Sequence, residues 1–578
     1  MKTPKLLKML KKLRLKTNWP LALGLLAVFV YLATICFRLD PDFGWHLRVG
    51  EDFFENHIFP RTDFYTFPFQ GYAWRDHEWL AEGPLWWVYH NFGYLPLVVI
   101  FSCLWFLPFW WLLREKNFTL KILVIMIALA AIAPFIGVRL QVLTLVGVAL
   151  LMRLFEGYLS KPSAIPVFPL SSRPCWRDPF IIKRLPRLRQ GEWLAMTNKG
   201  GLLRGGNKLL YLFPPIMLLW ANLHGSFVFG LLTGGIFLIH CFFKDRRKAW
   251  YFSISYFLGL ILTLLNPYGL GLWQEILVAA NPAYKSLIAE WVNLFNLPVN
   301  YFVIGYLVFF LVFWLANFRA KLSFPTYYLV SVLIFLVLGI MSRRNITIFV
   351  LLSLPVFVEL LRIDELLIKI KRRGLIIFIA EVVIANAVII SFTAQLLVLA
   401  GRENMFSGSY GSYPNTKIVS ELKKLPEGTS VFASYDWGGF LIQSNPNIKV
   451  LIDGRASYWK LDGDLAVRKY INIVANQVDF RVAQERYGFE VVVAGGLSSE
   501  PCFDYIFQKD LSNSLWQDFS IRILKSGDWR LVTKNENNSQ ELFVLRGSQS
   551  DKLLSSATNI SGVASNGSRN EEGQNNNN

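Results

Sequence analysis

The sequence predicts a polytopic α-helical membrane protein of about eleven spans with a small C-terminal α/β domain outside the cytoplasm. Three observations predict this fold class. The chain of 578 residues is 53% hydrophobic and only 17% charged, a composition typical of membrane proteins. Apolar runs of about 17 to 25 residues recur up to residue 400, and each can cross a hydrocarbon core about 30 Å thick. After residue 402, short helix-like and strand-like pieces alternate, which predicts an α/β domain.

The apolar runs and their basic connections predict the topology. The spans fall near residues 19–38, 94–113, 118–137, 142–158, 209–223, 225–242, 250–267, 301–317, 325–342, 346–361 and 374–399. The connections on one side are basic, from "REK" at 114 to "KIKRRG" at 369, which places them in the cytoplasm. An odd number of spans then puts the C-terminal domain outside. We predict a location in the plasma or inner membrane.

These features divide the chain into four parts. They are a basic cytoplasmic N-terminus (1–18), a transmembrane domain (19–400), an extracytoplasmic α/β domain (401–548) and a disordered tail (549–578). The transmembrane domain includes a first outside loop (39–93) and a basic cytoplasmic loop (159–208).

The net charge of +19 is concentrated rather than spread over a soluble domain. Residues 1–18 contribute +7 and residues 161–208 contribute +8. Basic segments beside apolar spans indicate a lipid bilayer as the partner, and they argue against nucleic acid.

The first outside loop concentrates the residues that could carry chemistry. It holds nine acids against three arginines, a net charge of −6, and four of the six histidines. Asp40 and Asp42 directly follow the first span, and side chains two apart in an extended segment point the same way. A carboxylate at the edge of a membrane has a pKa that burial raises and a nearby cation lowers, so it suits a base. The alternative is a pair of solvated flanking acids.

Further along the loop, "WRDHEWL" supplies Asp76, His77 and Glu78. Asp42, His77 and Glu78 are ligand types for a divalent ion such as Mg²⁺ or Mn²⁺, although no paired spacing such as H-E-x-x-H occurs. The many aromatic residues of the loop predict short helices at the bilayer surface that roof a cavity.

Polar residues at the outer ends of later spans predict an anion site. Arg139, Arg343 and Arg344 oppose the positive-inside tendency, and arginine binds phosphate with fixed bidentate geometry. Contact with lipid headgroups, or pairing with the acidic loop, explains them equally well. Asn222 and His224 of "WANLHGSF" lie on the same side, with helix capping as their alternative.

Taken together, "DPD" after the first span, the run "DFGWHLRVGEDFFENHIFPRTDFYTF", "WRDHEWLAE", "RLQ" and "WANLHGSF" resemble bacterial membrane glycosyltransferases of the GT-C superfamily. The C-terminal "SYDWGGFLIQ" and "LIDGRASYW" resemble the exported domain of uncharacterised members. The resemblance implies transfer of a sugar from a polyprenyl-phosphate carrier to an extracytoplasmic glycan, lipid or protein. It implies that Asp42 is the base, with Asp40 beside it, and that Glu78, or Asp76 in its place, is the second acid. The expected substrate-binding residues are His46, Asp63, His77, Arg139, Gln141, Asn222, His224, Arg343 and Arg344. The sequence "RLQ" stands where the family often has Arg-Pro-Gln.

The chemistry of the residues agrees with this assignment. A carboxylate must remove the proton of an acceptor hydroxyl as that hydroxyl attacks the anomeric carbon, which predicts inversion at that carbon. Two other functions compete. One is a transporter or flippase of lipid-linked or envelope precursors, and the other is a non-catalytic envelope assembly protein acting through "DWGG" and "IDGR". Ordinary turn chemistry is the preferred interpretation of those two segments.

Overall fold

A computed structural model describes residues 19–37, 39–113, 118–159, 208–279, 281, 287–288, 290–296, 301–316, 324–360, 414–495, 514–535 and 540–555. The predicted basic N-terminus, nearly all of the basic loop, the predicted span at 374–399 and most of the tail lie outside these residues.

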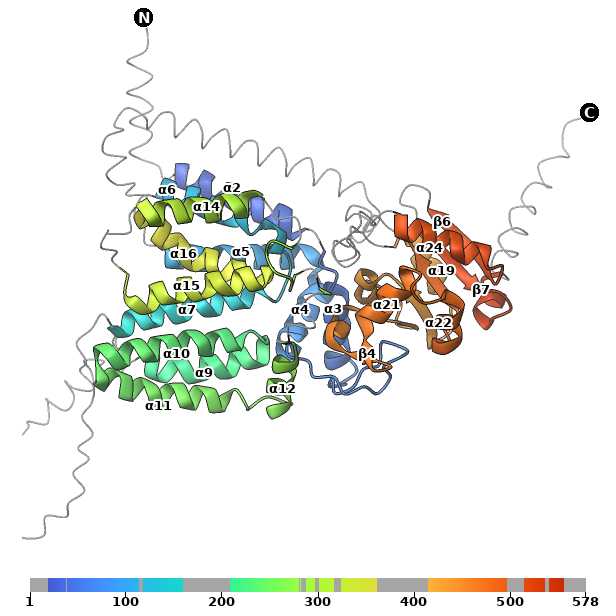
Figure 1. Cartoon of the computed structure of the whole chain (residues 1–578), viewed down its shortest axis with the longest axis horizontal. Helices are drawn as coiled ribbons and strands as arrows, with labels where there is room; N and C mark the ends of the chain where they lie inside the picture. Colours follow the sequence, from blue (N-terminus) through green and yellow to red (C-terminus); the bar gives the residue numbers. More distant parts are fainter. Residues whose placement is uncertain are drawn as a thin grey trace, which may run out of the picture.

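Apolar helices form the larger part of the described chain and lie side by side (Figure 1). They are α2 (Trp19–Cys36), α5 (Tyr94–Leu112), α6 (Phe118–Ala131), α7 (Val142–Leu159), α9 (Lys208–Leu223), α10 (Phe227–Lys244), α11 (Arg246–Leu262), α14 (Tyr301–Ala316), α15 (Thr326–Met341) and α16 (Ile346–Leu360). Each coincides with one of the predicted apolar runs. The mostly helical architecture with a C-terminal α/β region is therefore confirmed.

The surface of the helical part is itself apolar. Phe243 is 80% exposed and Trp250 is 67% exposed, which is unfavourable in water but suits contact with lipid. Three described helices, α5, α7 and α10, are both long and apolar enough to cross a membrane. Several other apolar helices, such as α15, are shorter in their described extent.

The C-terminal region is an α/β unit built on a five-stranded sheet. Its strands are β1 (Thr429–Ala433), β2 (Ile448–Val450), β5 (Val491–Ala494), β6 (Trp529–Asn535) and β7 (Gln540–Leu545), in the order β2-β1-β5-β7-β6. β1 runs parallel to β2 and β5, and β7 runs antiparallel to β5 and β6. A two-stranded sheet pairs β3 (Lys460–Leu461) with β4 (Asp464–Leu465). The described helices are α19 (Thr416–Leu422), α20 (Gly438–Ser444), α21 (Ala466–Val474), α22 (Phe480–Tyr487) and α24 (Ser514–Lys525).

Local sequence explains these elements. β5 is apolar and buried along its whole length, as expected of a central strand covered on both faces. Asn415 and Asp479 cap α19 and α22 through side-chain oxygens, and Gly488 ends α22 in the left-handed conformation. The tail begins later than we predicted, because residues 549–555 are helical and Asp551 accepts a hydrogen bond from Arg530.

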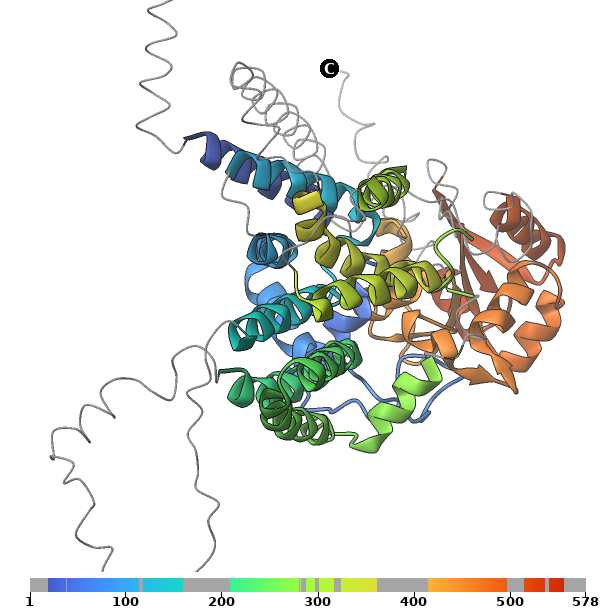
Figure 2. The same cartoon turned by 60° about the vertical axis from the view of Figure 1, so that its left-hand side comes forward.

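The first loop lies between the ends of the apolar helices and the α/β unit (Figures 1 and 2). It contains α3 (Phe43–Phe54) and α4 (Trp79–Phe92), and α12 (Leu270–Ala279) lies near it. The backbone N–H of Val450 in β2 donates to Tyr65, and the N–H of Phe67 donates to Val450. The loop therefore adds an extended segment to the edge of the sheet, which satisfies backbone groups that an edge strand leaves open.

Aromatic residues of the first loop are buried against the α/β unit. Trp45, Phe69 and Trp74 share one hydrophobic core with Phe432 and Trp459. The prediction that the aromatic residues of this loop lie at the bilayer surface is therefore wrong for these three. The sequence of the loop could not show that the α/β unit, 350 or more residues further along the chain, covers these side chains.

Two glycines allow α3 and α20 to come into direct backbone contact. A Cβ atom at Gly44 would lie 2.6 Å from the carbonyl carbon of Gly439, and one at Gly439 would lie 2.7 Å from the carbonyl oxygen of Pro41. No side chain fits at either position. Gly439 of "DWGG" thus lets the α/β unit pack directly against the start of α3.

Candidate functional site

A cavity of about 320 Å³ lies where the first loop, the neighbouring ends of the apolar helices and the α/β unit meet. Its charged and polar lining residues include Asp40, Asp42, His46, Asp76, His77, Glu78, Arg139, Gln141, Glu290, Arg344, Tyr435, Asp436, Arg455, Ser457 and Tyr458. The fold thus brings most of the predicted site residues together, with residues of the α/β unit opposite them.

Asp40 and Asp42 occupy a turn that leads into α3. We expected an extended segment, but Asp42 has helical backbone angles (φ −81°, ψ −16°) and precedes the first residue of α3. The Oδ1 atom of Asp40 accepts a hydrogen bond from the backbone N–H of Asp42 at 2.8 Å. The Oδ1 atom of Asp42 accepts one from the indole N–H of Trp45 at 3.0 Å. Burial, followed by the neighbouring Asp40, raises the pKa of Asp42 to about 8.

Arg139 links two acids at the side of this cavity. It forms ion pairs with Asp40 and with Glu290. Burial disfavours the charged guanidinium, but the two carboxylates outweigh it and raise the pKa of Arg139. Burial likewise raises the pKa of Glu290, but Arg139 outweighs it and the net shift is downward. Pairing with the acidic loop, one of the alternatives from the sequence, is therefore the observed state of Arg139.

Arg344 lines the cavity, whereas Arg343 does not. The backbone N–H of Arg344 donates to the carbonyl of Glu290 at 3.0 Å, and its carbonyl accepts from the Nε2 of Gln141 at 3.3 Å. The guanidinium of Arg344 forms no ion pair with another described residue. The backbone N–H of Arg343 donates to the carbonyl of Val292, which ties the same turn to the segment after Glu290. Arg344 is therefore the arginine best placed to meet an anion in the cavity.

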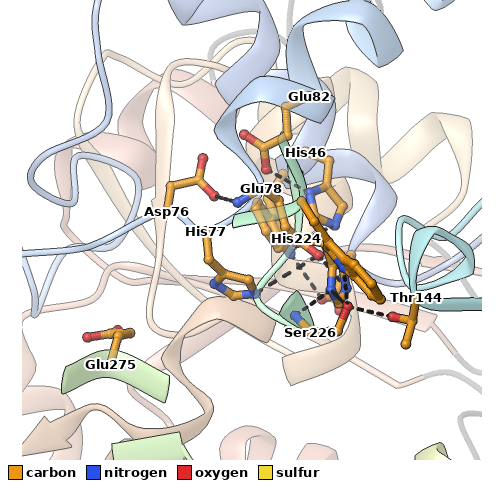
Figure 3. Close-up of polar contacts among 12 residues, drawn as sticks. His46, Asp76, His77, Glu78, Glu82, Thr144, His224, Ser226 and Glu275 are labelled. Atoms are coloured by element: carbon orange, nitrogen blue, oxygen red, sulfur yellow. Dashed lines mark hydrogen bonds and ion pairs between the residues drawn. The ribbon is translucent and has the colours of Figure 1, made fainter. Parts of the chain in front are cut away.

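Glu78 stands among three histidines just before α4 (Figure 3). Its carboxylate oxygens lie 3.0 Å from Nε2 of His224, 3.6 Å from Nε2 of His46 and 4.0 Å from Nε2 of His77. Burial raises the pKa of Glu78, but the three imidazoles outweigh burial, and the net shift is downward. Burial lowers the pKa of His46 to about 4 and also lowers that of His224. Glu78 is thus an ionised carboxylate that lies among three imidazole rings.

A second pair of acids lies behind Glu78. The Nδ1 atom of His46 is 2.7 Å from Oε1 of Glu82, and burial raises the pKa of both Glu82 and Asp76. One oxygen of each is buried and has no hydrogen-bond partner among the described residues. Glu82 and Asp76 therefore hold a proton more readily than ordinary carboxyls do.

Asp63 has a different role from the one we expected. It is fully buried, does not line the cavity and pairs with Nη1 of Arg455 at 2.8 Å. Asp453 pairs with the same guanidinium through Nη2 at 2.5 Å, and the rings of Tyr65 and Trp74 lie 4.8 and 4.7 Å from it. This buried group joins the first loop to the α/β unit.

Asn222 also lies away from the cavity lining. Its Nδ2 donates to the carbonyls of Leu218 and Leu265, and its Oδ1 accepts from the indole N–H of Trp79. Asn222 therefore joins the end of α9 to the segment after α11 and contacts Trp79, the residue next to Glu78. His77 lines the cavity and is the most exposed of the three histidines around Glu78.

Reasoning from the sequence missed the residues that come from other segments. Glu290 is the acid of "IAEWVNLF", and its position in an otherwise apolar loop was the available signal. Asp436 belongs to "DWGG", and burial, followed by Asp40, raises its pKa to about 6. Tyr458 donates a hydrogen bond to Glu275 of α12 at 2.7 Å, and Arg75 pairs with the same carboxylate. These contacts hold Tyr458 in place in the lining of the cavity.

Part of the cavity wall suits a divalent cation, because carboxylate oxygens bind Mg²⁺ or Mn²⁺. The predicted ligands Asp42, His77 and Glu78 all line the cavity, but among the described residues their ligand atoms do not gather into one group. The tightest group of candidate ligands among the described residues is His46, Glu78 and Glu82, whose ligand atoms lie within 4.8 Å of one another. The buried, unpartnered oxygen of Glu82 is available to such an ion.

The sequence matches no protein-family model and no curated protein sequence. Solved structures do match. The oligosaccharyltransferase AglB of the archaeon Archaeoglobus fulgidus, in complex with an inhibitory peptide and a dolichol-phosphate, aligns with a TM-score of 0.50 at 12% identity. The alignment covers 93% of this chain and 75% of AglB. A second structure of an oligosaccharyltransferase from the same organism, tethered to an acceptor peptide, aligns over the same shares at 13% identity with a TM-score of 0.48. The likeness to AglB is one of fold, and it extends over both the apolar helices and the α/β unit.

Proposed function

We propose that this protein is a membrane glycosyltransferase that moves a sugar from a polyprenyl-phosphate carrier to an acceptor outside the cytoplasm. The observation that carries the proposal is the cavity, in which a carboxyl with a raised pKa, Asp42, lies with Arg344, a guanidinium without an ion pair among the described residues. The likeness of fold to AglB supports it, because AglB binds a dolichol-phosphate and a peptide.

Asp42 is the general base of the proposed reaction. An acceptor hydroxyl is a poor nucleophile at neutral pH, so a carboxylate must take its proton during attack on the anomeric carbon. A base works best when its pKa is near the working pH, and burial places that of Asp42 at about 8. Asp40 keeps this pKa high and is itself held by Arg139. A single displacement of this kind inverts the configuration at the sugar carbon.

Arg344 receives the leaving phosphate of the carrier. Negative charge grows on that phosphate as the glycosidic bond breaks, and a fixed cation stabilises it. Arg139 is already shared between Asp40 and Glu290, so it serves mainly to position those acids. A divalent ion held by His46, Glu78 and Glu82 would add positive charge to the same site.

The α/β unit supplies the acceptor side of the cavity. Asp436, Tyr458 and Ser457 face the cavity from this unit, and their carboxyl and hydroxyl groups can hydrogen-bond a glycan, lipid or protein acceptor. The unit is part of the site rather than a separate binding module, because the first loop completes both its sheet and its core. The plasma membrane is the proposed location, with the cavity on the outer side.

The decisive experiment is transfer by the purified protein from polyprenyl-phosphate sugars to peptide and glycan acceptors. Asp42→Asn removes the base while keeping the size of the side chain, so transfer should be lost although the protein still inserts and folds. Asp464→Asn is the matched control, because Asp464 pairs with Arg468 at the surface of the α/β unit and does not line the cavity.

Full activity of Asp42→Asn would refute the base. Uptake of a lipid-linked precursor by proteoliposomes, without any transfer product, would favour the flippase instead.

A further inference from the structure

The segment "WANLHGSF", which joins α9 and α10, surrounds Glu78 although it lies about 145 residues further along the chain. His224 of this segment is 5% exposed and lies outside the cavity lining. Its Nε2 atom is 3.0 Å from Oε1 of Glu78. The role of His224 therefore depends on which of its ring nitrogens carries the proton.

The hydroxyl of Ser226 decides this question. A serine hydroxyl has one donor and two acceptor positions. The indole N–H of Trp220 donates to Oγ of Ser226 at 3.1 Å, and the hydroxyl of Thr144 donates to it at 2.6 Å. Both acceptor positions are thus filled. The remaining Ser226 proton is directed at Nδ1 of His224, 2.7 Å away (Figure 3).

The backbone of Ser226 points to the same conclusion. Its N–H donates to Nδ1 of His224 at 3.0 Å. A ring nitrogen that accepts hydrogen bonds carries no proton, so the proton of the neutral ring is on Nε2, facing Glu78. The approach is off-axis, because Nε2 forms no hydrogen bond of good angle among the described residues. The attraction between the N–H dipole and the carboxylate is therefore mainly electrostatic.

We propose that Trp220, Thr144 and Ser226 form a relay that fixes His224 in its Nε2–H tautomer and thereby makes His224 the positioning residue of Glu78. This inference rests on the proposed function, in which Glu78 is the second acid of the site. The relay keeps the carboxylate of Glu78 turned towards His224 and prevents it from rotating when substrate enters.

Two further contacts hold the segment in place around Glu78. The indole N–H of Trp79, the residue after Glu78, donates to Asn222 at 3.3 Å. A Cβ atom at Gly225 would lie 2.8 Å from Cδ2 of His77, the residue before Glu78, so a larger residue would displace the His77 ring. The segment therefore contacts both neighbours of Glu78 as well as its carboxylate.

Ser226→Ala tests the relay with the full-length protein. It removes the hydroxyl that donates to Nδ1, leaves only the backbone N–H of residue 226 on that atom, and deprives Thr144 and Trp220 of their acceptor. We expect kcat for sugar transfer to fall roughly tenfold or more, since one hydrogen bond in a chain ending on a charged group is lost, while KM for the lipid donor changes little. Ser226→Thr restores the hydroxyl and should recover activity. Ser331→Ala is the control, because the buried Ser331 hydroxyl donates to the carbonyl of Tyr327 within α15, away from the cavity.

His224 offers a complementary pair of variants. His224→Gln places an amide N–H near the position of Nε2 and should retain more activity than His224→Ala. His240→Gln, on α10 away from the cavity, is the matched control.

A readout without activity separates the relay from the proposed function. The protein has six histidines, so ¹⁵N-histidine labelling with solid-state NMR resolves their tautomers, and His224→Gln identifies the relevant signal. We expect an Nε2–H signal for His224 that changes in Ser226→Ala and returns in Ser226→Thr. A proton on Nδ1, or full activity of Ser226→Ala, would overturn the relay. Absence of transfer by the wild type would refute the proposed function, but the NMR measurement would still test the tautomer of His224.

Discussion

Replacement of Gly454 by alanine tests whether the α/β unit closes directly over Asp42. Gly454 begins the η5 segment (Gly454–Tyr458) of "IDGR" and lines the cavity. A Cβ atom at this position would lie 2.9 Å from Cγ of Asp42 and closer still to its Oδ1. Non-bonded carbon atoms approach to about 3.5 Å at the closest favourable distance, so the carboxyl group must move by roughly 1 Å.

The size of the effect follows from that displacement. A carboxylate at the end of a side chain can rotate away at little cost, so Gly454→Ala should fold with nearly normal stability. A misplacement of about 1 Å at the reacting atoms can reduce the rate on the order of 100-fold. We therefore expect kcat/KM for sugar transfer to fall about 100-fold without any change of charge in the site.

The assay compares transfer by Gly454→Ala with the wild type and with Gly305→Ala. Open space surrounds the position that a Cβ atom would take at Gly305 of α14, so this control adds the same methyl group without a new contact among the described residues. Thermal unfolding in detergent checks that both variants are folded. Wild-type kcat/KM in a folded Gly454→Ala protein would show that Asp42 is not the base, or that the α/β unit does not cover it during catalysis.

Two further predictions concern charge. The base acts in its ionised form, so kcat/KM should rise with pH, about tenfold per unit, and level off above about pH 8, where Asp42 loses its proton. A value of kcat/KM that does not change between about pH 6 and 9 would contradict the assignment of Asp42 as the base. Arg455→Met leaves Asp63 and Asp453 buried without their guanidinium, so the free energy of unfolding should fall by about 3 to 5 kcal/mol in denaturant titrations. Arg468→Met, which breaks an exposed pair with Asp464, should cost less than about 1 kcal/mol, and equal losses in the two variants would refute the structural role of Arg455.

The apolar helices and the strands were predictable because their signals are local. The composition of an apolar run, such as the one that forms α5, shows that its side chains lie among apolar groups rather than in water. The strands "SVFASYD" and "FEVVVAGG" likewise carry their β-branched and aromatic residues within a few positions, and they became β1 and β5. The clustering of acids and histidines in one loop also pointed to residues that line the cavity.

The sequence by itself thus determined the class of fold, the placement of most elements and the importance of the first loop. Only the tertiary structure decided which of its polar residues meet. Asp63 and Asp42 are both acids of one loop, yet one is buried against Arg455 and the other lines the cavity. Glu290, Asp436 and Ser226 come from distant segments that no local period connects to that loop. The physical reason is that helix and strand signals repeat within a few residues, whereas a site is made by packing of segments whose separation along the chain leaves no trace in the sequence of either one.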